Sequence, residues 1–211
     1  MKVDIWSDVR CPFCYIGKRK FEQALAQFPG KADVEIEWHS FELDPNALTV
    51  LDKSAYDYLA ERYGRSREWA IETHKHVTQT AAEVGLTFNF DEAVIANSFD
   101  AHRLIQMAKQ HGAGDQAEEQ LFKAHFTDGK NIADHEVLIE IGTSIGLNSL
   151  DLQTMLKTED YVDEVRYDEK TAGDLGINAV PFFIFDQKLA VSGAQSPETF
   201  LSALNKAAGD N

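Results

Sequence analysis

The chain contains only two cysteines, and they lie three residues apart in Cys11-Pro12-Phe13-Cys14. Two cysteines exclude a secreted scaffold held by several disulfides, and a single pair excludes a four-cysteine zinc or iron–sulfur site. Three interpretations remain: a redox dithiol, half of a cysteine–histidine metal site, or two coincidental core cysteines. The sequence around the motif has to distinguish among them.

The hydrophobic pattern changes from strand to helix at this motif. Residues 2–7 alternate between apolar and polar side chains, which is typical of a short strand. From Cys14 to Pro29 the apolar residues recur at helical spacing. Pro12 suits the first position of a helix, where its missing N–H costs nothing. The pattern predicts a strand followed by a helix, with Cys11 at the helix N-terminus and Cys14 about one turn later.

This location favours disulfide exchange, which requires a thiolate. A free cysteine, with a pKa of about 8.5, is mostly protonated at neutral pH. The positive end of the helix dipole favours the charged form at Cys11. Between Val9 and Phe21 there are four basic residues and no acidic one, in a chain of formal net charge −15, and they add to the effect. Cys14, inside the first turn, is expected to be more buried and to act as the resolving thiol.

A metal site receives little support from the histidines. The chain has seven, and none shows the His-x3–5-His spacing of a zinc finger. His74 and His76 are two residues apart in a helical stretch and point to different faces. We therefore expect no metal and no cofactor beyond the redox-active disulfide, with glutathione considered as a co-substrate.

Charge and hydropathy exclude several partners. The net charge of −15 argues against nucleic acid and anionic membranes, because both would repel the chain. No stretch approaches the roughly 18 consecutive apolar residues of a membrane span. The N-terminus has no apolar signal-peptide region, because aspartates interrupt it. We expect a soluble cytoplasmic protein.

The order of elements predicts an α/β fold. Val34 to His39 alternates as a second strand, which completes a right-handed βαβ unit. Residues from about 45 to about 170 are predicted to be helical almost throughout. Several helix starts are predicted in this region. Ser66 and Ser98 can each cap a helix, Asp115 with Glu118 forms a capping-box pattern, and Asp134 and Ser149 can start two more helices.

The C-terminal part returns to strands. Gly176 to Phe185 is a turn followed by an apolar run with Pro181 at its start, and Leu189 to Ser192 forms the second strand of a hairpin. Ser196-Pro197 opens a final helix. The whole chain therefore predicts a thioredoxin-like βαβ–ββα core, residues 1–45 and 171–211, interrupted by a helical subdomain, residues 46–170.

Four motifs together resemble a known family. Cys11 to Gly17, followed much later by Ala179-Val180-Pro181-Phe182, resembles the DsbA-like branch of the thioredoxin superfamily. Within that branch, Asn97 to Arg103 and Ser192 to Gln195 resemble the FrnE-like subgroup. The resemblance covers essentially the whole chain, and the motifs are specific when they are taken jointly.

The resemblance implies a thiol–disulfide oxidoreductase that acts on thiols and disulfides of proteins or small molecules. Cys11 matches the attacking thiol and Cys14 the resolving one. Pro181 matches a cis-proline that faces the disulfide, although most X–Pro bonds are trans and a trans proline opening a strand is the alternative. If the bond is cis, Val180 offers backbone groups to an extended substrate segment. Without an export signal, reduction or isomerisation is expected rather than net oxidation.

Two positions depart from the better-known relatives. Phe13 stands where the periplasmic oxidants of the family carry a histidine, so we expect a less oxidising protein. Asp4 lies one residue further from the motif than the buried acid of thioredoxins; it is a candidate proton acceptor, and a half-exposed strand aspartate is the alternative. Phe13, Trp6 and Tyr15 are candidates for an apolar peptide-binding groove, with core packing the alternative for Trp6.

Two other functions stay open at this point. The same branch includes glutathione-dependent isomerases and transferases that resemble 2-hydroxychromene-2-carboxylate isomerase and typically have serine as the nucleophile. The presence of both Cys11 and Cys14 argues against that activity. The third interpretation is a non-catalytic interaction module or chaperone that binds through the helical insertion. The sequence predicts no oligomeric state.

Overall fold

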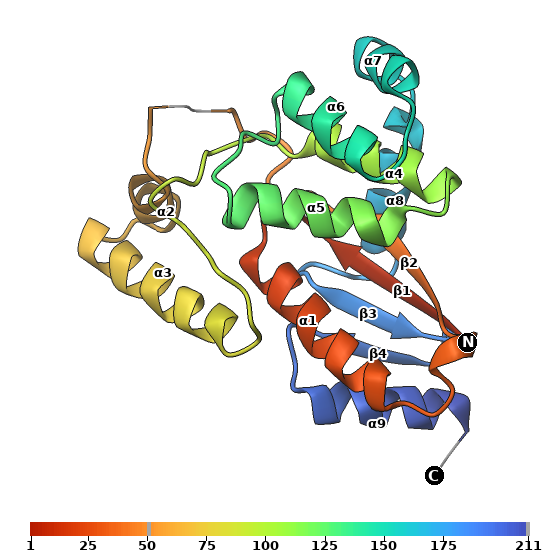
Figure 1. The fold of residues 1–211 in the computed structure, drawn as a ribbon. Helices are drawn as coiled ribbons and strands as arrows, with labels where there is room; N and C mark the ends of the chain where they lie inside the picture. The colour runs from red at the N-terminus through yellow and green to blue at the C-terminus, as the bar shows by residue number, and fades with distance from the viewer. Residues whose placement is uncertain (50–51, 210–211) are drawn as a thin grey trace.

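A four-stranded sheet positions the thiol motif (Figure 1). The computed structural model describes residues 1–49 and 52–209. The strands are β1 (Lys2–Ser7), β2 (Glu35–Ser40), β3 (Phe182–Phe185) and β4 (Leu189–Ser192). Their order in the sheet is β2-β1-β3-β4, with β2 parallel to β1, and with β3 and β4 each antiparallel to its neighbour. The predicted α/β fold class is confirmed, and β1 has the predicted bounds.

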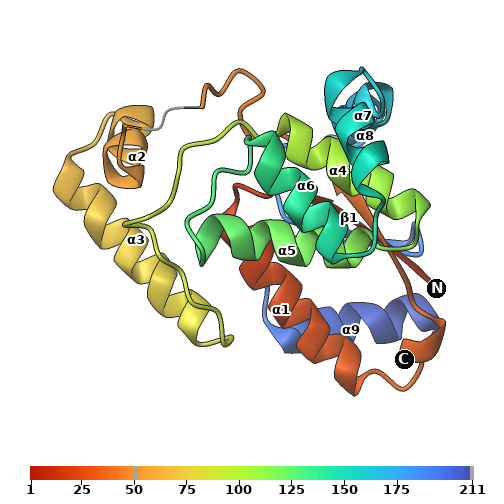
Figure 2. The same cartoon turned by 45° about the horizontal axis from the view of Figure 1, so that its top comes forward.

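Helices cover both faces of this sheet. Their bounds are α1 (Pro12–Gln27), α2 (Ala55–Tyr63), α3 (Arg67–Ala82), α4 (Phe99–Gln110), α5 (Gly114–Phe126), α6 (His135–Ser144), α7 (Ser149–Lys157), α8 (Val162–Asp174) and α9 (Pro197–Ala208), with a short 3₁₀ turn at Lys31–Asp33. Helices α1 and α9 lie side by side, whereas α4, α5 and α8 pack against β2 (Figure 2). The α2–α3 hairpin stands apart from the sheet, beyond the N-terminal end of α1.

An aromatic cluster fixes α1 to the sheet. Phe21 of α1 packs against Phe183 of β3, with ring centroids 5.6 Å apart, and Phe200 of α9 lies 4.6 Å from Phe183. All three side chains are fully buried. Burial of one such ring contributes about 2 kcal/mol. The start of α1, and therefore the thiol motif, is held firmly against the sheet.

Side-chain caps explain most helix starts. They are made as predicted by Ser66, Asp134 and Ser196. The predicted capping box of Asp115 and Glu118 does not form, because α5 already begins at Gly114 and Asp115 Oδ1 accepts the Trp38 Nε1–H at 3.0 Å instead. Helix α7 begins at Ser149, as predicted, and Asn148 caps it, since the Asn148 amide oxygen accepts two N–H groups of the first turn.

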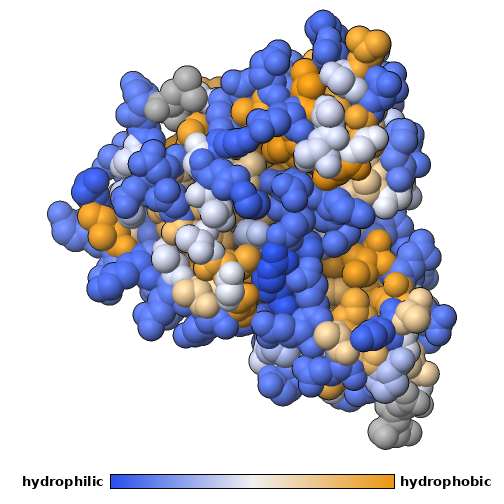
Figure 3. All heavy atoms as spheres, viewed as in Figure 1, coloured by the Kyte–Doolittle hydropathy of each residue, from blue (hydrophilic) through white to orange (hydrophobic). Residues whose placement is uncertain are grey.

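The surface is mostly polar. Figure 3 shows hydrophilic side chains over much of one face, with hydrophobic side chains gathered in separate patches. Among the residues that the structure describes, no helix is long and apolar enough to cross a membrane.

Candidate active site

Cys11 occupies the N-cap position of α1. Its backbone is extended, with φ −89° and ψ 112°, and its N–H donates to Asp8 O at 2.9 Å. Pro12 follows as the first helical residue, and the first turn holds no acidic side chain. Only 5% of Cys11 is exposed. The thiol thus lies at the positive end of the helix dipole, as the sequence predicts.

The loop before β3 faces this thiol. Cys11 Sγ lies 3.6 Å from Val180 O, and the Val180–Pro181 peptide bond is cis. Helix α1 approaches the loop closely at Gly17, where a Cβ atom would lie only 2.9 Å from Pro181 Cγ. The glycine therefore permits the contact. The fold brings together Cys11, Val180 and Pro181, which are far apart in the sequence.

Cys14 lies one turn further along α1 and is fully buried. Its N–H donates to Cys11 O at 3.0 Å. Burial, and next the neighbouring Cys11, raise the pKa of the Cys14 thiol well above its ordinary value. The Asp8 N–H and the Ser7 hydroxyl act in the opposite direction and favour the thiolate. Cys14 is thus a protonated thiol with polar groups from the end of β1 beside it.

A buried polar cluster continues from Asp8 into the helical layer. The Asp8 carboxylate accepts the N–H groups of Arg10 at 3.0 Å and Leu43 at 2.8 Å. Its Oδ1 lies 3.6 Å from His102 Nε2 on α4, an ion-pair distance beyond hydrogen-bond range. Glu118 of α5 is also buried, and its Oε2 has no hydrogen-bond partner among the described residues.

In this cluster, burial and the neighbouring charged groups shift the pKa values in opposite directions. Burial favours the neutral form of Asp8, but His102 and the two backbone N–H groups lower the pKa of Asp8. Burial likewise favours neutral His102, but Asp8, and then Glu118, raise the pKa of His102. For Glu118 burial dominates and raises the pKa to about 8. The cluster thus combines an Asp8–His102 ion pair with a carboxyl group that titrates near neutral pH.

The positive charge predicted around the motif is largely neutralised. Lys18 is buried to 3% exposure and pairs with carboxylates from α1 and α5, and Arg19 pairs with Glu119. Except for Glu22 of α1, these partners lie on α5, far away in the sequence, so local composition overestimates the positive potential. Arg10 is different: its Nη2 donates to the Tyr58 hydroxyl at 3.0 Å, and it forms no ion pair within the described chain.

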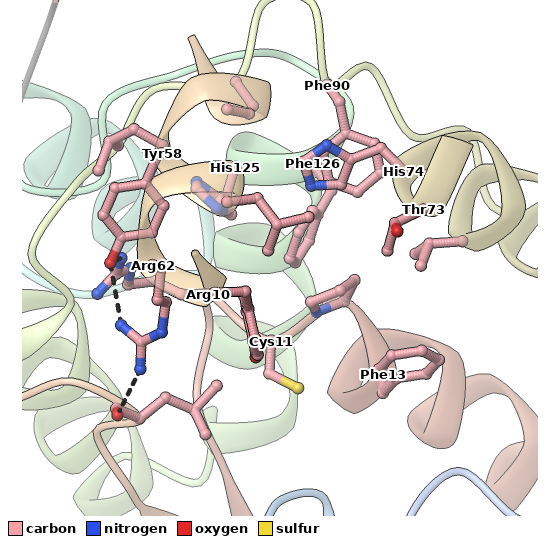
Figure 4. A pocket seen from close by; sticks show the side chains of 18 of the residues that line it. Arg10, Cys11, Phe13, Tyr58, Arg62, Thr73, His74, Phe90, His125 and Phe126 are labelled. Atoms are coloured by element: carbon pink, nitrogen blue, oxygen red, sulfur yellow. Dashed lines mark hydrogen bonds between the residues drawn. The ribbon is translucent and has the colours of Figure 1, made fainter. Parts of the chain in front are cut away.

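A cavity of about 460 Å³ opens beside Cys11. Its walls come from the motif itself, the α2–α3 hairpin, the segment before α4 and the end of α5, and they are mostly apolar and aromatic. In Figure 4 the Tyr58, Arg10 and Arg62 side chains lie on one side, and the rings of Phe90, His74 and Phe126 lie on the other. The α2–α3 hairpin therefore closes one side of the thiol site.

Comparison with known proteins identifies the family of this chain. A profile of the DSBA-like thioredoxin domain matches residues 2–205. The chain belongs to the DsbA-like thioredoxin family. YwbO of Bacillus subtilis (strain 168) is 30% identical over 205 residues, which are 96% of this chain and 95% of that protein.

Two solved structures share the fold of this DsbA-like chain. A probable DsbA oxidoreductase from Streptomyces coelicolor is 38% identical, with a TM-score of 0.93 over 100% of this chain and 91% of the other. The cytosolic disulfide reductase DsbM from Pseudomonas aeruginosa, solved with GSH, has a TM-score of 0.69 at 16% identity and covers 99% of this chain and 100% of the other. The second similarity extends to the fold alone.

Two of the aromatic candidates lie in the core of this DsbA-like domain. Trp6 stacks on His39 with ring centroids 4.4 Å apart, and Tyr15 stacks on Phe122 at 4.9 Å. Both are buried, so neither forms a substrate groove. Their large rings fill the space between the sheet and the helical layer. Of the three candidates, Phe13 is the exposed one, with 45% of its surface accessible beside the cavity.

Asp4 makes its contacts elsewhere. Its carboxylate pairs with Lys2 at 2.9 Å and with His39 Nε2 at 2.9 Å, and His39 Nδ1 pairs with Asp168 at 2.8 Å. Asp4, His39 and Glu37 present potential metal ligands within 4.8 Å of one another, but Lys2 bonds both carboxylates and both His39 nitrogens are engaged. The groups beside Cys14 are the Ser7 hydroxyl and the Asp8 N–H instead.

The segment from Asn97 to Arg103 supports the site from behind. Asn97 Oδ1 accepts the Phe99 N–H at 2.9 Å, whereas the predicted cap Ser98 makes no such bond. His102 belongs to the buried cluster described above. Arg103 donates to three backbone carbonyls at and beyond the end of α7. The sequence indicates this motif, but the pairing of His102 with Asp8 depends on the tertiary fold.

Proposed function

We propose that this chain is a thiol–disulfide oxidoreductase, a disulfide reductase or isomerase, with Cys11 as the nucleophile. The observation that carries the proposal is the position of Cys11 Sγ, at the N-terminus of α1 and 3.6 Å from Val180 O. A substrate disulfide approaching Cys11 meets the peptide groups of Val180 and Pro181 on one side and the exposed ring of Phe13 on the other.

The reaction proceeds in two exchange steps. The Cys11 thiolate attacks one sulfur of the substrate disulfide, and the other sulfur leaves as a thiolate. Cys14 then loses its proton and attacks the Cys11 sulfur, which releases the second substrate thiolate and forms the Cys11–Cys14 disulfide. The substrate gains two electrons, and the dithiol loses them. The oxidised chain runs the same steps in reverse.

The timing of the second step follows from the surroundings of Cys14. Part of the rise in the pKa of Cys14 comes from Cys11. Once Cys11 is in a mixed disulfide, its negative charge is gone and this contribution disappears. The Ser7 hydroxyl and the Asp8 N–H then favour the Cys14 thiolate, and the thiolate that leaves the substrate can take up the Cys14 proton. Resolution is therefore promoted by formation of the mixed disulfide.

We assign the reductive direction and a cytoplasmic setting as part of this proposal. Both cysteines belong to the motif, so the chain has no further pair for a structural disulfide of the kind that oxidising compartments favour. Phe13 offers no charge or polar hydrogen to the Cys11 thiolate, which suits a less oxidising protein. Membership of the FrnE-like subgroup rests on the motifs at residues 97–103 and 192–195.

The test compares the two cysteine variants in insulin reduction with dithiothreitol as the reductant. Cys11→Ser is expected to abolish catalysis, because no nucleophile remains. Cys14→Ser, incubated with insulin without dithiothreitol, is expected to accumulate a mixed disulfide on Cys11, visible as a mass increase that added dithiothreitol removes. Full activity of Cys11→Ser would disprove the assignment.

Glutathione distinguishes the main alternative, a glutathione-dependent isomerase or transferase. The alternative is favoured by two results together: the native chain catalyses no disulfide exchange, and both the native chain and Cys11→Ser bind glutathione tightly. If glutathione serves only as a co-substrate that reduces the Cys11–Cys14 bridge, its oxidation depends on both cysteines. An interaction module would show neither behaviour.

A further inference from the structure

We infer that the cavity beside Cys11 selects low-molecular-weight disulfides that carry an apolar, aromatic body and an anionic group, with Arg10 holding the anion. This inference rests on the proposed function and names its substrate class. It follows from the shape of the cavity, the charges in its wall and the place of the sulfur.

The size and lining of the cavity suit a small molecule. Its volume of about 460 Å³ lies within the range of roughly 300–1,000 Å³ that is typical of small-molecule sites. The aromatic wall contains Phe90, Phe126 and Trp69, and Phe13 lies at the motif. An extended polypeptide would place polar backbone groups against these rings, at a desolvation cost. A flat aromatic ring has no polar backbone groups and avoids this desolvation cost when it enters the cavity.

The charges of the wall favour an anion. The chain has 35 acidic residues, yet none of the described residues that line this cavity is Asp or Glu, and two are arginines. Arg62 is neutralised by Asp44, with Nη1 at 2.7 Å from Oδ2. Arg10 has only the Tyr58 hydroxyl, at 3.0 Å, as a side-chain partner within the described chain. One uncompensated guanidinium therefore faces an apolar space, where a carboxylate binds more strongly than in water.

The two cavity histidines do not compete for that role. His74 and His125 both line the wall. Burial lowers the pKa of each to about 4, so both are neutral at neutral pH. His74 stacks on Phe90 with ring centroids 4.1 Å apart and behaves as part of the aromatic surface. Arg10 thus remains the anchor for negative charge.

The cavity also places the substrate for reaction. Arg10 precedes Cys11 directly, and both residues line the same space. A disulfide whose anionic group lies on Arg10 brings a sulfur atom to Cys11 Sγ. The balance is that of the exchange proposed above: the Cys11 thiolate, the Cys14 thiol and one substrate disulfide give the Cys11–Cys14 disulfide, two substrate thiolates and one proton. An external dithiol reduces the bridge for the next turnover.

The first experiment uses pre-reduced protein in single-turnover exchange with two aromatic disulfides. One, 5,5′-dithiobis(2-nitrobenzoate), carries carboxylates, and the other, 4,4′-dithiodipyridine, is uncharged. Each rate is divided by the rate of dithiothreitol with the same disulfide, which corrects for the difference in intrinsic reactivity between the two disulfides. Arg10→Met is expected to lower the normalised rate about tenfold or more for the carboxylate, the effect of losing one charge-assisted bond, and to change the uncharged disulfide little.

Two further variants sharpen this experiment. Arg65→Met removes an exposed cation outside the cavity and is expected to leave the preference for the carboxylate intact. Thr73→Phe adds bulk to the cavity wall and is expected to slow exchange with both aromatic disulfides. Equal losses for both disulfides in Arg10→Met would overturn the inference, because Arg10 would then act on Cys11 rather than on the substrate.

A binding measurement separates this inference from the proposed function. The S-methyl thioether of 2-nitro-5-thiobenzoate has no disulfide to exchange, and its binding is followed by quenching of Trp69, which lines the cavity. Saturable quenching that Arg10→Met weakens supports the inference, with Trp69→Phe as the signal control. Insulin reduction without binding or charge preference would overturn the inference and leave the proposed function standing. Binding without any exchange would overturn the proposed function and the substrate assignment together.

Discussion

The neighbouring residues Glu118 and Glu119 provide a sharp test of the electrostatics beneath the thiols. Both lie on α5, but their surroundings are opposite. Glu118 is buried with one oxygen unpaired among the described residues, and burial raises its pKa to about 8. Glu119 pairs with Arg19 and accepts the Tyr15 hydroxyl at 2.7 Å, and these partners, despite burial, lower its pKa. Replacement of each by glutamine removes one charge and keeps nearly the same shape.

The sign and size of the Glu118 effect follow from its proton balance. Between the unfolded pKa of 4.5 and the folded value of about 8, the native state keeps a proton that the unfolded state has lost. The free energy of unfolding therefore falls by about 1.4 kcal/mol per pH unit in this window because of Glu118. Glu118→Gln removes this loss. The variant is expected to match the native chain near pH 4.5 and to exceed its stability by roughly 3 kcal/mol at pH 7.

Urea unfolding followed by tryptophan fluorescence, at several pH values from below 4.5 up to 8, measures the difference. Glu119→Gln is the matched control with the opposite sign. Its carboxylate stabilises the fold above its unfolded pKa, so that variant should lose stability at pH 7, and the loss should shrink as the pH falls through the folded pKa. A Glu118→Gln variant that is less stable than the native chain at pH 7, or whose advantage does not grow with pH, would refute this account.

Three further substitutions, the first with a matched control, test the site and its support. Gly17→Ala places a Cβ against Pro181 and is expected to lower the insulin-reduction rate several-fold, whereas Gly173→Ala, where the added atom meets nothing within 4 Å, should stabilise the fold by roughly 0.5–1 kcal/mol in urea unfolding. Phe13→His adds a hydrogen-bond donor beside the Cys11 thiolate and should make the disulfide more oxidising on equilibration with glutathione; an unchanged potential would contradict this. Arg103→Met removes a charged donor from three backbone carbonyls and should lower the free energy of unfolding by about 2–4 kcal/mol, a loss that an unshifted urea midpoint would exclude.

The first strand and helix were predictable because their signals are local. Alternation over residues 2–7 and the helical spacing after Cys14 depend only on near neighbours, and Pro12 fixes the start of α1. The cap of α3 at Ser66 is local in the same way. Helix α7 begins at Ser149, as predicted, but Asn148 and Ser149 are both good caps, and only the geometry shows that Asn148 is the one used.

The buried cluster and the cavity could not be predicted in this way. Asp8 meets His102 only because α4 packs behind the sheet, and a charge pattern along the chain carries no information on that pairing. Likewise, the four basic residues near the motif suggested a strongly positive site, but carboxylates from α5 neutralise Lys18 and Arg19. Local composition records which charges are present, whereas tertiary packing decides which of them remain uncompensated.

Asp8 connects the two sides of the site. Its carboxylate accepts the Arg10 N–H, so the same side chain that pairs with His102 beneath Cys14 also holds the backbone turn that leads Arg10 into the cavity. The Cys14 thiol therefore has its polar surroundings on the buried side of the motif, and substrate charge is bound on the open side, with one short turn between them. A change at Asp8 should disturb both resolution by Cys14 and the preference for anionic disulfides, whereas a change at His102 should affect resolution alone. Comparison of these two positions shows whether proton transfer and substrate selection are separable in this fold.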